Sequence, residues 1–224
     1  MLLHIADVMS ADMVERFQAR LSAAPWNDGR ATAGHQSAKA KHNLQVPAED
    51  PVAAELGQEL AQALGHAQRF VSAALPQRIF PPVFSLYRPG DRFGTHVDNA
   101  IRYGHRGAIR TDLSATVFLT PLDAYDGGAL VIEDVFGPRE IRLPPGHMVL
   151  YPSSSLHHVT PVTRGERLAA ILWMQSLVRD DGQRRILFDL DCTIQDLSVD
   201  LPADPRIVSL TGIYHNLVRR WAEP

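Results

Sequence analysis

The sequence predicts an α+β protein whose β core is a sandwich, barrel or jelly roll with helices at both ends. Apolar residues recur at helical spacing before about residue 75 and again after residue 180. Between residues 79 and 177 the chain instead carries short apolar or alternating runs that turn residues separate. Many short strands with such spacing are typical of an all-β core rather than of a helical bundle.

The first expected helix runs from Ser10 to Leu21. Ser10 or Asp12 can cap it, because a short polar side chain accepts a hydrogen bond from the free backbone N–H groups at a helix start. Its apolar residues recur three or four positions apart, which predicts one buried face: Met13, Val14, Phe17 and Leu21.

A second helix is expected from Asp50 and Pro51 to Ala74. Asp50 is the predicted cap, and Pro51 fits the first turn, where no partner exists for an N–H group. Pro76 ends this helix, because the residue before a proline disfavours the helical conformation.

The β core is expected over about residues 79–178. Pro-Gly, Gly-Gly and Gly-Pro pairs supply its turns, and Gly127-Gly128 is most simply one of them. The clearest strand candidates are Val83 to Tyr87, Leu113 to Leu119, Ala129 to Ile132, Met148 to Tyr151 and Leu168 to Trp173.

The tail of the chain returns to helical spacing. Residues 180–182 are expected to form a turn, followed by a helix over Ile186 to Leu197 and a last helix from Ile207 to Trp221. So short a segment is unlikely to fold alone, so we expect it to pack on the β core. The predicted division is a domain of residues 1–178 and a C-terminal helical extension of residues 179–224.

Bulk composition excludes several classes of function. Lys and Arg number 22 against 25 Asp and Glu in 224 residues, so no basic surplus points to nucleic acid. No apolar stretch approaches the roughly 20 residues of a membrane span, and the N-terminus lacks the features of a secretory signal. Cys192 is the single cysteine, which excludes an intrachain disulfide and fits a reducing compartment. We therefore expect a cytoplasmic protein that binds neither nucleic acid nor membranes.

His96 and Asp98 form the first candidate site, because they stand two residues apart in an expected strand. Side chains at such positions point to the same face, so an imidazole and a carboxylate would share one pocket. They would be two of the three ligands of a 2-His-1-carboxylate triad, which leaves metal positions open. Since the chain has ten histidines, the pair alone is weak evidence.

A third ligand is expected at His157 or His158. Adjacent strand residues face opposite sides, so at most one of the two joins the pocket. Arg167 follows ten residues after His157. In a hairpin that turns at residues 163–166, the two would lie about five positions apart along the ribbon, or roughly 16 Å. An imidazole, a metal, a five-carbon diacid and the arginine fork can together span this gap.

These motifs together resemble the Fe(II)/2-oxoglutarate-dependent dioxygenases of the prolyl-4-hydroxylase type, and most closely the bacterial PKHD-type, PiuC-like hydroxylases. The resemblance covers nearly the whole chain. The motifs that carry it are Tyr87-x-x-Gly90 before His96-x-Asp98, the run from Arg110 to Leu119, Gly127-Gly128, the segment from Leu156 and His157 to Gly165-x-Arg167, Trp173-x-Gln175-Ser176, and in the tail Leu187 to Asp191 and Leu210 to Leu217.

The resemblance implies a fold and a reaction. The fold would be a double-stranded β-helix (jelly roll) flanked by N-terminal helices and the C-terminal helical extension. His96, Asp98 and His157 would hold Fe(II), Arg167 would bind the distal carboxylate of 2-oxoglutarate, and Tyr87 would contact the same cosubstrate. Hydroxylation of a substrate with O₂ would release succinate and CO₂, and L-ascorbate would re-reduce the iron.

Several residues have two readings. Tyr87 is equally a core tyrosine with a satisfied hydroxyl, and Trp173 either lines the pocket or packs in the core. Arg110 and Asp112 fit a structural ion pair better than a catalytic role.

The chain departs from the family pattern at two positions. His158 stands where the family more usually has arginine, and Ala129 stands where Gly-Gly-Glu-Leu is the usual reading. The second departure puts a contact near the turn in doubt. The segment from Trp26 to His42 precedes the β core, and we expect it to reach over the pocket mouth as a lid.

Two other functions stay open beside the hydroxylase. One is a non-catalytic sensor or binding module for iron or 2-oxoglutarate on the same fold, although a pure binder needs no open metal positions. The other is a hydrolase or cupin-type isomerase with Zn²⁺ or Mn²⁺, in which Arg167 would have no role. The substrate is equally open: prolyl or lysyl side chains, free amino acids, siderophore-like small molecules and peptides all fit, and a homo-oligomer is possible.

Overall fold

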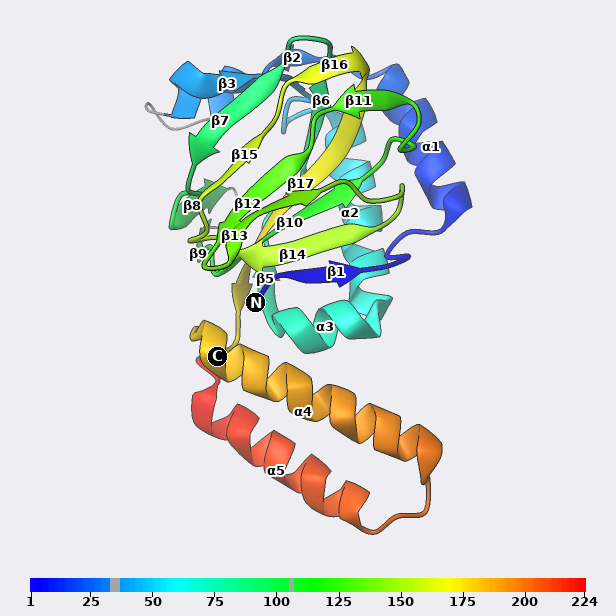
Figure 1. Cartoon of the computed structure of the whole chain (residues 1–224), viewed down its shortest axis with the longest axis vertical. Coiled ribbons are helices and arrows are strands. Elements are labelled where there is room, and N and C mark those ends of the chain that lie inside the picture. Colours follow the sequence, from blue (N-terminus) through cyan, green and yellow to red (C-terminus); the bar gives the residue numbers. More distant parts are fainter. Residues whose placement is uncertain (33–36, 105–106) are drawn as a thin grey trace.

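The computed structural model describes residues 1–32, 37–104 and 107–224. Two antiparallel sheets face each other, helices cover the outer face of the larger sheet, and a pair of helices extends from one end (Figure 1). The predicted α+β jelly roll with flanking helices is confirmed. No helix in these ranges is long and apolar enough to cross a membrane.

The larger sheet lies between the helices and the smaller sheet, so its middle strands are buried on both faces. Every residue of β10 (Leu113–Phe118) is buried, including the polar Ser114 and Thr116 that alternate with its apolar residues. The strands in spatial order are β1 (Leu3–Ile5), β14 (Met148–Pro152), β10, β17 (Arg167–Ser176), β6 (Val83–Tyr87), β4 (Leu44–Gln45) and β2 (Asn27–Asp28), and β5 (Pro76–Ile79) also pairs with β17.

The smaller sheet carries the candidate ligands and covers the inner face of the larger one (Figure 1). Its strands in spatial order are β13 (Gly137–Ile141), β12 (Leu130–Asp134), β15 (His157–Val159), β7 (Arg92–His96) and β3 (Lys41–His42). Two further two-stranded sheets pair β11 (Tyr125–Gly127) with β16 (Val162–Gly165) and β8 (Ile101–Gly104) with β9 (Gly107–Arg110).

Three helices pack on the larger sheet and close the main core. The first prediction is confirmed: α1 (Ala11–Ser22) starts after Ser10, whose hydroxyl accepts a hydrogen bond from the Met13 N–H group. Short 3₁₀ turns, η1 (Gly29–Thr32) and η2 (Ser37–Ala40), follow it. The apolar side chains on the inner face of α1 are buried against the larger sheet, together with Phe84 of β6.

The second predicted helix is two helices, so the expectation of one continuous helix to Ala74 was wrong. Asp50 caps α2 (Pro51–His66) as expected, but the backbone leaves the helical region at Ala67 before α3 (Gln68–Ala74) begins. Gly65, which has low helix propensity, lies just before the break. The new direction of α3 leaves Phe70 fully buried in the main core.

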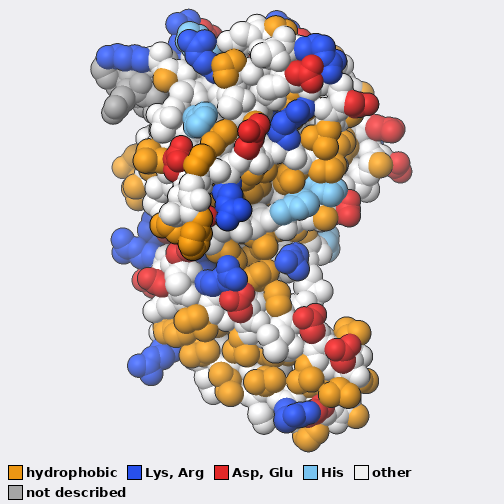
Figure 2. Space-filling model, in the orientation of Figure 1, with side chains coloured by type: hydrophobic (Ala, Val, Ile, Leu, Met, Phe, Trp, Pro, Cys, Tyr) orange, Lys and Arg blue, Asp and Glu red, His pale blue; other side chains and the backbone are white. Residues whose placement is uncertain are grey.

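The tail forms a helical pair, α4 (Asp181–Asp200) and α5 (Arg206–Trp221), as the spacing predicted. The expected turn at residues 180–182 is wrong, because Asp180 caps α4 and its carboxylate accepts a hydrogen bond from the Gln183 N–H group at 2.8 Å. No residue of α5 is buried. Figure 2 shows hydrophobic side chains over this pair at the lower end of the view. The exposed ones there are Ile186, Val199, Leu201, Val208 and Ile213.

Arg184 joins the start of α4 to the residues that follow β17. Its side chain is only 2% exposed, and Nη1 donates hydrogen bonds to the carbonyl oxygens of Val178 and Arg179, both at 2.7 Å. Nη2 donates to the Asp181 carboxylate, which also pairs with the N-terminal ammonium group at 2.6 Å. This buried cation is one of the attachments of the helical pair, beside the apolar cluster that packs Leu187 against Leu75 and Val178.

Arg184→Ala should lower the free energy of unfolding by about 2–4 kcal/mol, because two buried carbonyls lose a charged donor. Its neighbour Arg185 is the matched control, since it makes an exposed ion pair with Asp189. Arg185→Ala should cost less than about 0.5 kcal/mol. Urea denaturation of both variants measures the difference, and equal losses would contradict the role of Arg184.

Candidate metal and cosubstrate site

His96, Asp98 and His157 come together between the sheets, with ligand atoms all within 4.8 Å of one another. Strands β7 and β15 are paired so that His96 lies opposite His157, and their ring centroids are 4.2 Å apart. The expectation that Asp98 lies on the same strand was wrong, because β7 ends at His96. The chain beyond the strand still brings Asp98 Oδ2 within 3.8 Å of His157 Nε2.

Backbone carbonyls orient both imidazoles. Nδ1 of His96 lies 2.8 Å from the Gly94 oxygen, and Nδ1 of His157 lies 3.0 Å from the Ser155 oxygen. Because a carbonyl oxygen only accepts, each neutral ring carries its proton on Nδ1 and leaves Nε2 with a free lone pair. This is the tautomer in which metal-binding histidines are usually held.

Burial keeps the His96 ring neutral. Burial, with a smaller contribution from the neighbouring His157, lowers the pKa of His96 to about 4. A metal ion binds only the neutral imidazole, so His96 needs to lose no proton at pH 7.

Ser114 positions the Asp98 carboxylate and was missed in the sequence. Its hydroxyl donates to Asp98 Oδ2 at 2.6 Å and lies 2.7 Å from the Ser153 hydroxyl. Strand β10 offers a signal that could have revealed it, since Ser114 and Thr116 alternate with apolar residues. Polar residues on one face of a fully buried strand indicate that this face borders a polar site.

Arg167 lies at the start of β17, 1% exposed, between the aromatic rings of Tyr87 and Phe118. Its Cζ atom is 5.3 Å from each ring centroid. Within the described ranges, Nε and Nη1 are buried and have no hydrogen-bond partner. A buried guanidinium without a counter-charge is costly, so this slot is suited to an anion such as a carboxylate.

The expected hairpin between His157 and Arg167 does not form. Strand β15 pairs with β12 and β7 in the smaller sheet, whereas β17 pairs with β10, β6 and β5 in the larger one. The intervening strand β16 pairs with β11 instead. Both residues are buried, on different sheets, so the ribbon distance does not apply.

Tyr87 is both a core tyrosine and a neighbour of Arg167. The two residues lie opposite each other in the pairing of β6 with β17. Burial raises the pKa of Tyr87 to about 12, against the opposing effect of the Arg167 charge. The phenol is therefore neutral and can donate a hydrogen bond toward the anion slot.

Gly128 does more than form a turn, because it leaves room for Arg167. Its φ is +60°, and a Cβ atom there would lie 2.8 Å from Val162 Cγ2 and 3.0 Å from Arg167 Cδ. The adjacent Ala129 is fully buried and its N–H group donates to Thr160 Oγ1 at 2.9 Å. With alanine at position 129, the backbone still makes this hydrogen bond beside the turn.

The other residues that the sequence singled out lie outside the set of candidate ligands. Arg110 and Asp112 form the expected ion pair at 2.7 Å, and Asp112 also accepts a hydrogen bond from the Ser176 N–H group. Trp173 is 7% exposed and contacts Arg102. His158 is half-buried, whereas His157 is 4% exposed. This difference agrees with the expectation that adjacent strand residues point to opposite faces of the sheet.

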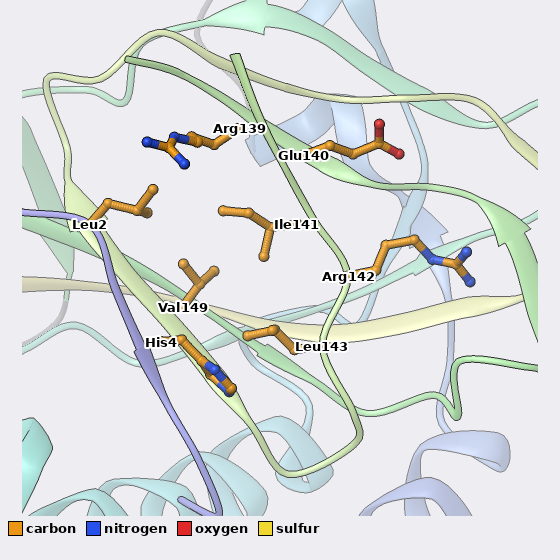
Figure 3. Close-up of a pocket in the computed structure, with 8 residues that line it drawn as sticks. All are labelled: Leu2, His4, Arg139, Glu140, Ile141, Arg142, Leu143 and Val149. Atoms are coloured by element: carbon orange, nitrogen blue, oxygen red, sulfur yellow. The ribbon is translucent and has the colours of Figure 1, made fainter. Parts of the chain in front are cut away.

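The expected lid from Trp26 to His42 is partly outside the described residues, which lack 33–36. Its last two residues form β3 and pair with β7, beside the strand that ends in His96. An open pocket of 260 Å³ lies elsewhere, between β1, β13 and β14 (Figure 3), and none of the candidate ligands lines it.

The residues present fit Fe(II) and a dicarboxylate. Two imidazoles and one carboxylate are the donor set of non-haem iron centres that keep positions open. The buried, unpartnered donors of Arg167 fit the far carboxylate of a bidentate keto acid.

Comparisons with known proteins agree with this geometry. Residues 82–175 match the family model of the 2OG-Fe(II) oxygenase superfamily, and residues 181–223 match that of the PKHD-type hydroxylase C-terminal domain. The chain is 52% identical to a PKHD-type hydroxylase of Xanthomonas campestris and 53% identical to one of Bordetella pertussis. It is 52% identical to the PKHD-type hydroxylase PiuC of Pseudomonas aeruginosa. Each alignment covers 100% of both chains.

Solved structures show the same fold at low identity. A Pseudomonas putida prolyl-4-hydroxylase is 22% identical, with a TM-score of 0.53 over 78% of this chain and 92% of that one. HygX from Streptomyces hygroscopicus, solved with nickel and 2-oxoglutarate bound, is 15% identical with a TM-score of 0.54 over 79% and 84% of the two chains.

Gly128→Ala should weaken 2-oxoglutarate binding by about tenfold or more, because the new methyl group displaces the Arg167 side chain. Gly137→Ala is the matched control: its φ is also positive, at +103°, but nothing lies within 4 Å of the added Cβ. Calorimetric titration of both anaerobic Fe(II)-loaded variants with 2-oxoglutarate measures the difference. Equal affinity in the two variants would show that Gly128 does not leave room for Arg167.

Proposed function

We propose that His96, Asp98 and His157 hold Fe(II) in this chain. The chain belongs to the PKHD-type hydroxylases of the 2OG-Fe(II) oxygenase superfamily. The enzyme is an Fe(II)- and 2-oxoglutarate-dependent hydroxylase. In the proposal, Arg167 binds the distal carboxylate of 2-oxoglutarate and Tyr87 supports it. The observation that carries the proposal is the buried Arg167 guanidinium, which lacks a counter-charge among the described residues.

Bound iron and 2-oxoglutarate supply the oxidising power with which O₂ hydroxylates a C–H bond. The chain supplies geometry and charge. Gly94 and Ser155 fix the imidazole tautomers through their carbonyl oxygens, and Ser114 holds the Asp98 carboxylate. The apolar cluster between the sheets keeps water from the Arg167 slot, which strengthens its charge interactions.

The finer parts of the proposal rest on this assignment. Succinate and CO₂ are the expected co-products, and L-ascorbate is the expected reductant that restores Fe(II). The match of residues 181–223 to a separate family model supports a division into a catalytic domain of residues 1–178 and a helical extension of residues 179–224. The single cysteine, Cys192, fits a cytoplasmic location.

Catalysis is favoured over the alternative of a non-catalytic sensor or binding module. The relatives that are 52–53% identical are named as hydroxylases. All three candidate ligands are also present, and the two histidines have free Nε2 atoms. A three-ligand set leaves metal positions open, which a pure binder of iron or 2-oxoglutarate does not need.

Anaerobic addition of Fe(II) and 2-oxoglutarate should produce a weak visible absorption band from charge transfer between the metal and the keto acid. Arg167→Ala should weaken the band at a given 2-oxoglutarate concentration and His96→Ala should abolish it, whereas Arg185→Ala on the distant helix α4 should leave it intact. Absence of the band in folded, iron-loaded protein would contradict the proposal. Aerobic incubation with cell-extract metabolites, followed by a search for products 16 mass units heavier, then identifies the substrate.

A further inference from the structure

Arg102 and Trp173 form a stacked pair beside the candidate iron ligands. Arg102 lies in β8, where its neighbours Ile101 and Tyr103 are 43% and 81% exposed, so the strand turns Arg102 inward. Its guanidinium carbon is 3.6 Å from the Trp173 ring centroid and 4.9 Å from that of Phe80. Such stacking holds the plane of the guanidinium and leaves its edge for hydrogen bonding.

Both members of the pair have a buried donor that the protein does not satisfy. In the part of the chain that the structure describes, Arg102 Nε and Trp173 Nε1 have no hydrogen-bond partner. Guanidinium and indole N–H groups only donate, so a complementary ligand must accept from both. Native proteins rarely leave buried donors unsatisfied, and two in one contact indicate a site for a bound group.

The pair adjoins the metal ligands but is separate from the Arg167 slot. Trp173 lies opposite Ser114 across β17 and β10, and Ser114 holds Asp98. Arg167 starts the same strand six residues earlier, about 20 Å along the strand at its usual rise. A 2-oxoglutarate molecule bound at Arg167 therefore cannot also reach the donors of Arg102 and Trp173.

Charge at the site favours an anion. Burial lowers the pKa of Arg102, while Asp98 opposes this effect. Once Fe(II) and 2-oxoglutarate are bound, their charges balance those of Asp98 and Arg167, so the positive charge of Arg102 has no remaining counterpart among these groups. The buried Lys41, whose pKa is lowered by burial and by Arg102, lies near the same groups and adds to the positive charge. The planar edge of the Arg102 guanidinium matches the geometry of a carboxylate.

We propose that Arg102 and Trp173 bind a carboxylate of the substrate, so that this hydroxylase acts on an acidic molecule. This inference rests on the proposed function, because it places the substrate beside the iron ligands. The carboxylate accepts from the guanidinium edge and from the indole N–H group. It thereby holds the rest of the substrate near the three metal ligands.

The test compares two probes that differ only in charge, N-acetylglycine and its neutral primary amide. Each is titrated calorimetrically into anaerobic enzyme saturated with Fe(II) and 2-oxoglutarate, which fills the Arg167 slot. The wild type should bind the carboxylate about tenfold more tightly than the amide. Arg102→Gln should remove this preference, and Arg102→Lys should keep part of it, since lysine retains the charge without the fork. Arg185→Gln is the control and should keep all of it.

Each outcome decides the inference. Equal affinity for the two probes, no saturable binding of the carboxylate, or a preference that survives in folded Arg102→Gln would overturn it. Tighter binding of methyl phosphate than of N-acetylglycine would also overturn the assignment to a carboxylate. Failure of the proposed function has a different signature, namely no absorption band in the wild type. In that case the loss or survival of the preference in Arg102→Gln still decides the role of Arg102.

Discussion

The burial of one positive charge, on Arg167, is the constraint on which the rest of the site depends. The guanidinium is placed between Tyr87 and Phe118 in the apolar space between the sheets, where an uncompensated cation is destabilising. The fold accepts this cost at a middle strand of the larger sheet, buried on both faces. Gly128 leaves room for the side chain, and no acid in the described ranges fills the slot. A carboxylate bound to Arg167, as proposed, would supply the missing counter-charge.

The metal centre follows from the same sandwich. The smaller sheet pairs β7 with β15 and sets two imidazoles opposite each other, while Ser114 of the larger sheet reaches across to the Asp98 carboxylate. The site is therefore built by both sheets, and the distance between them is held by the cluster of buried apolar residues. The same inner face continues along β17 to Trp173, where the stacked Arg102 is the place that we propose for a second negative charge.

Local signals predicted most of the fold, and non-local pairing explains most of the errors. Caps located the starts of α1 and α2, and apolar spacing located α4 and α5 to within a few residues, because these features act within one element. The His157–Arg167 hairpin was wrong because strand partners are chosen by the whole fold, and a short segment can switch sheets. Motif resemblance still selected the three residues that the fold brings together and the buried Arg167. It gave no sign of Arg102, whose partner Trp173 is 71 residues away in sequence.

The most direct test is a crystal structure of the protein grown anaerobically with Fe(II) and 2-oxoglutarate. We expect one metal ion bound by His96, Asp98 and His157, with the distal carboxylate of 2-oxoglutarate on the Arg167 guanidinium. A metal bound by other residues, or a cosubstrate whose carboxylate leaves Arg167 without a counter-charge, would contradict the account.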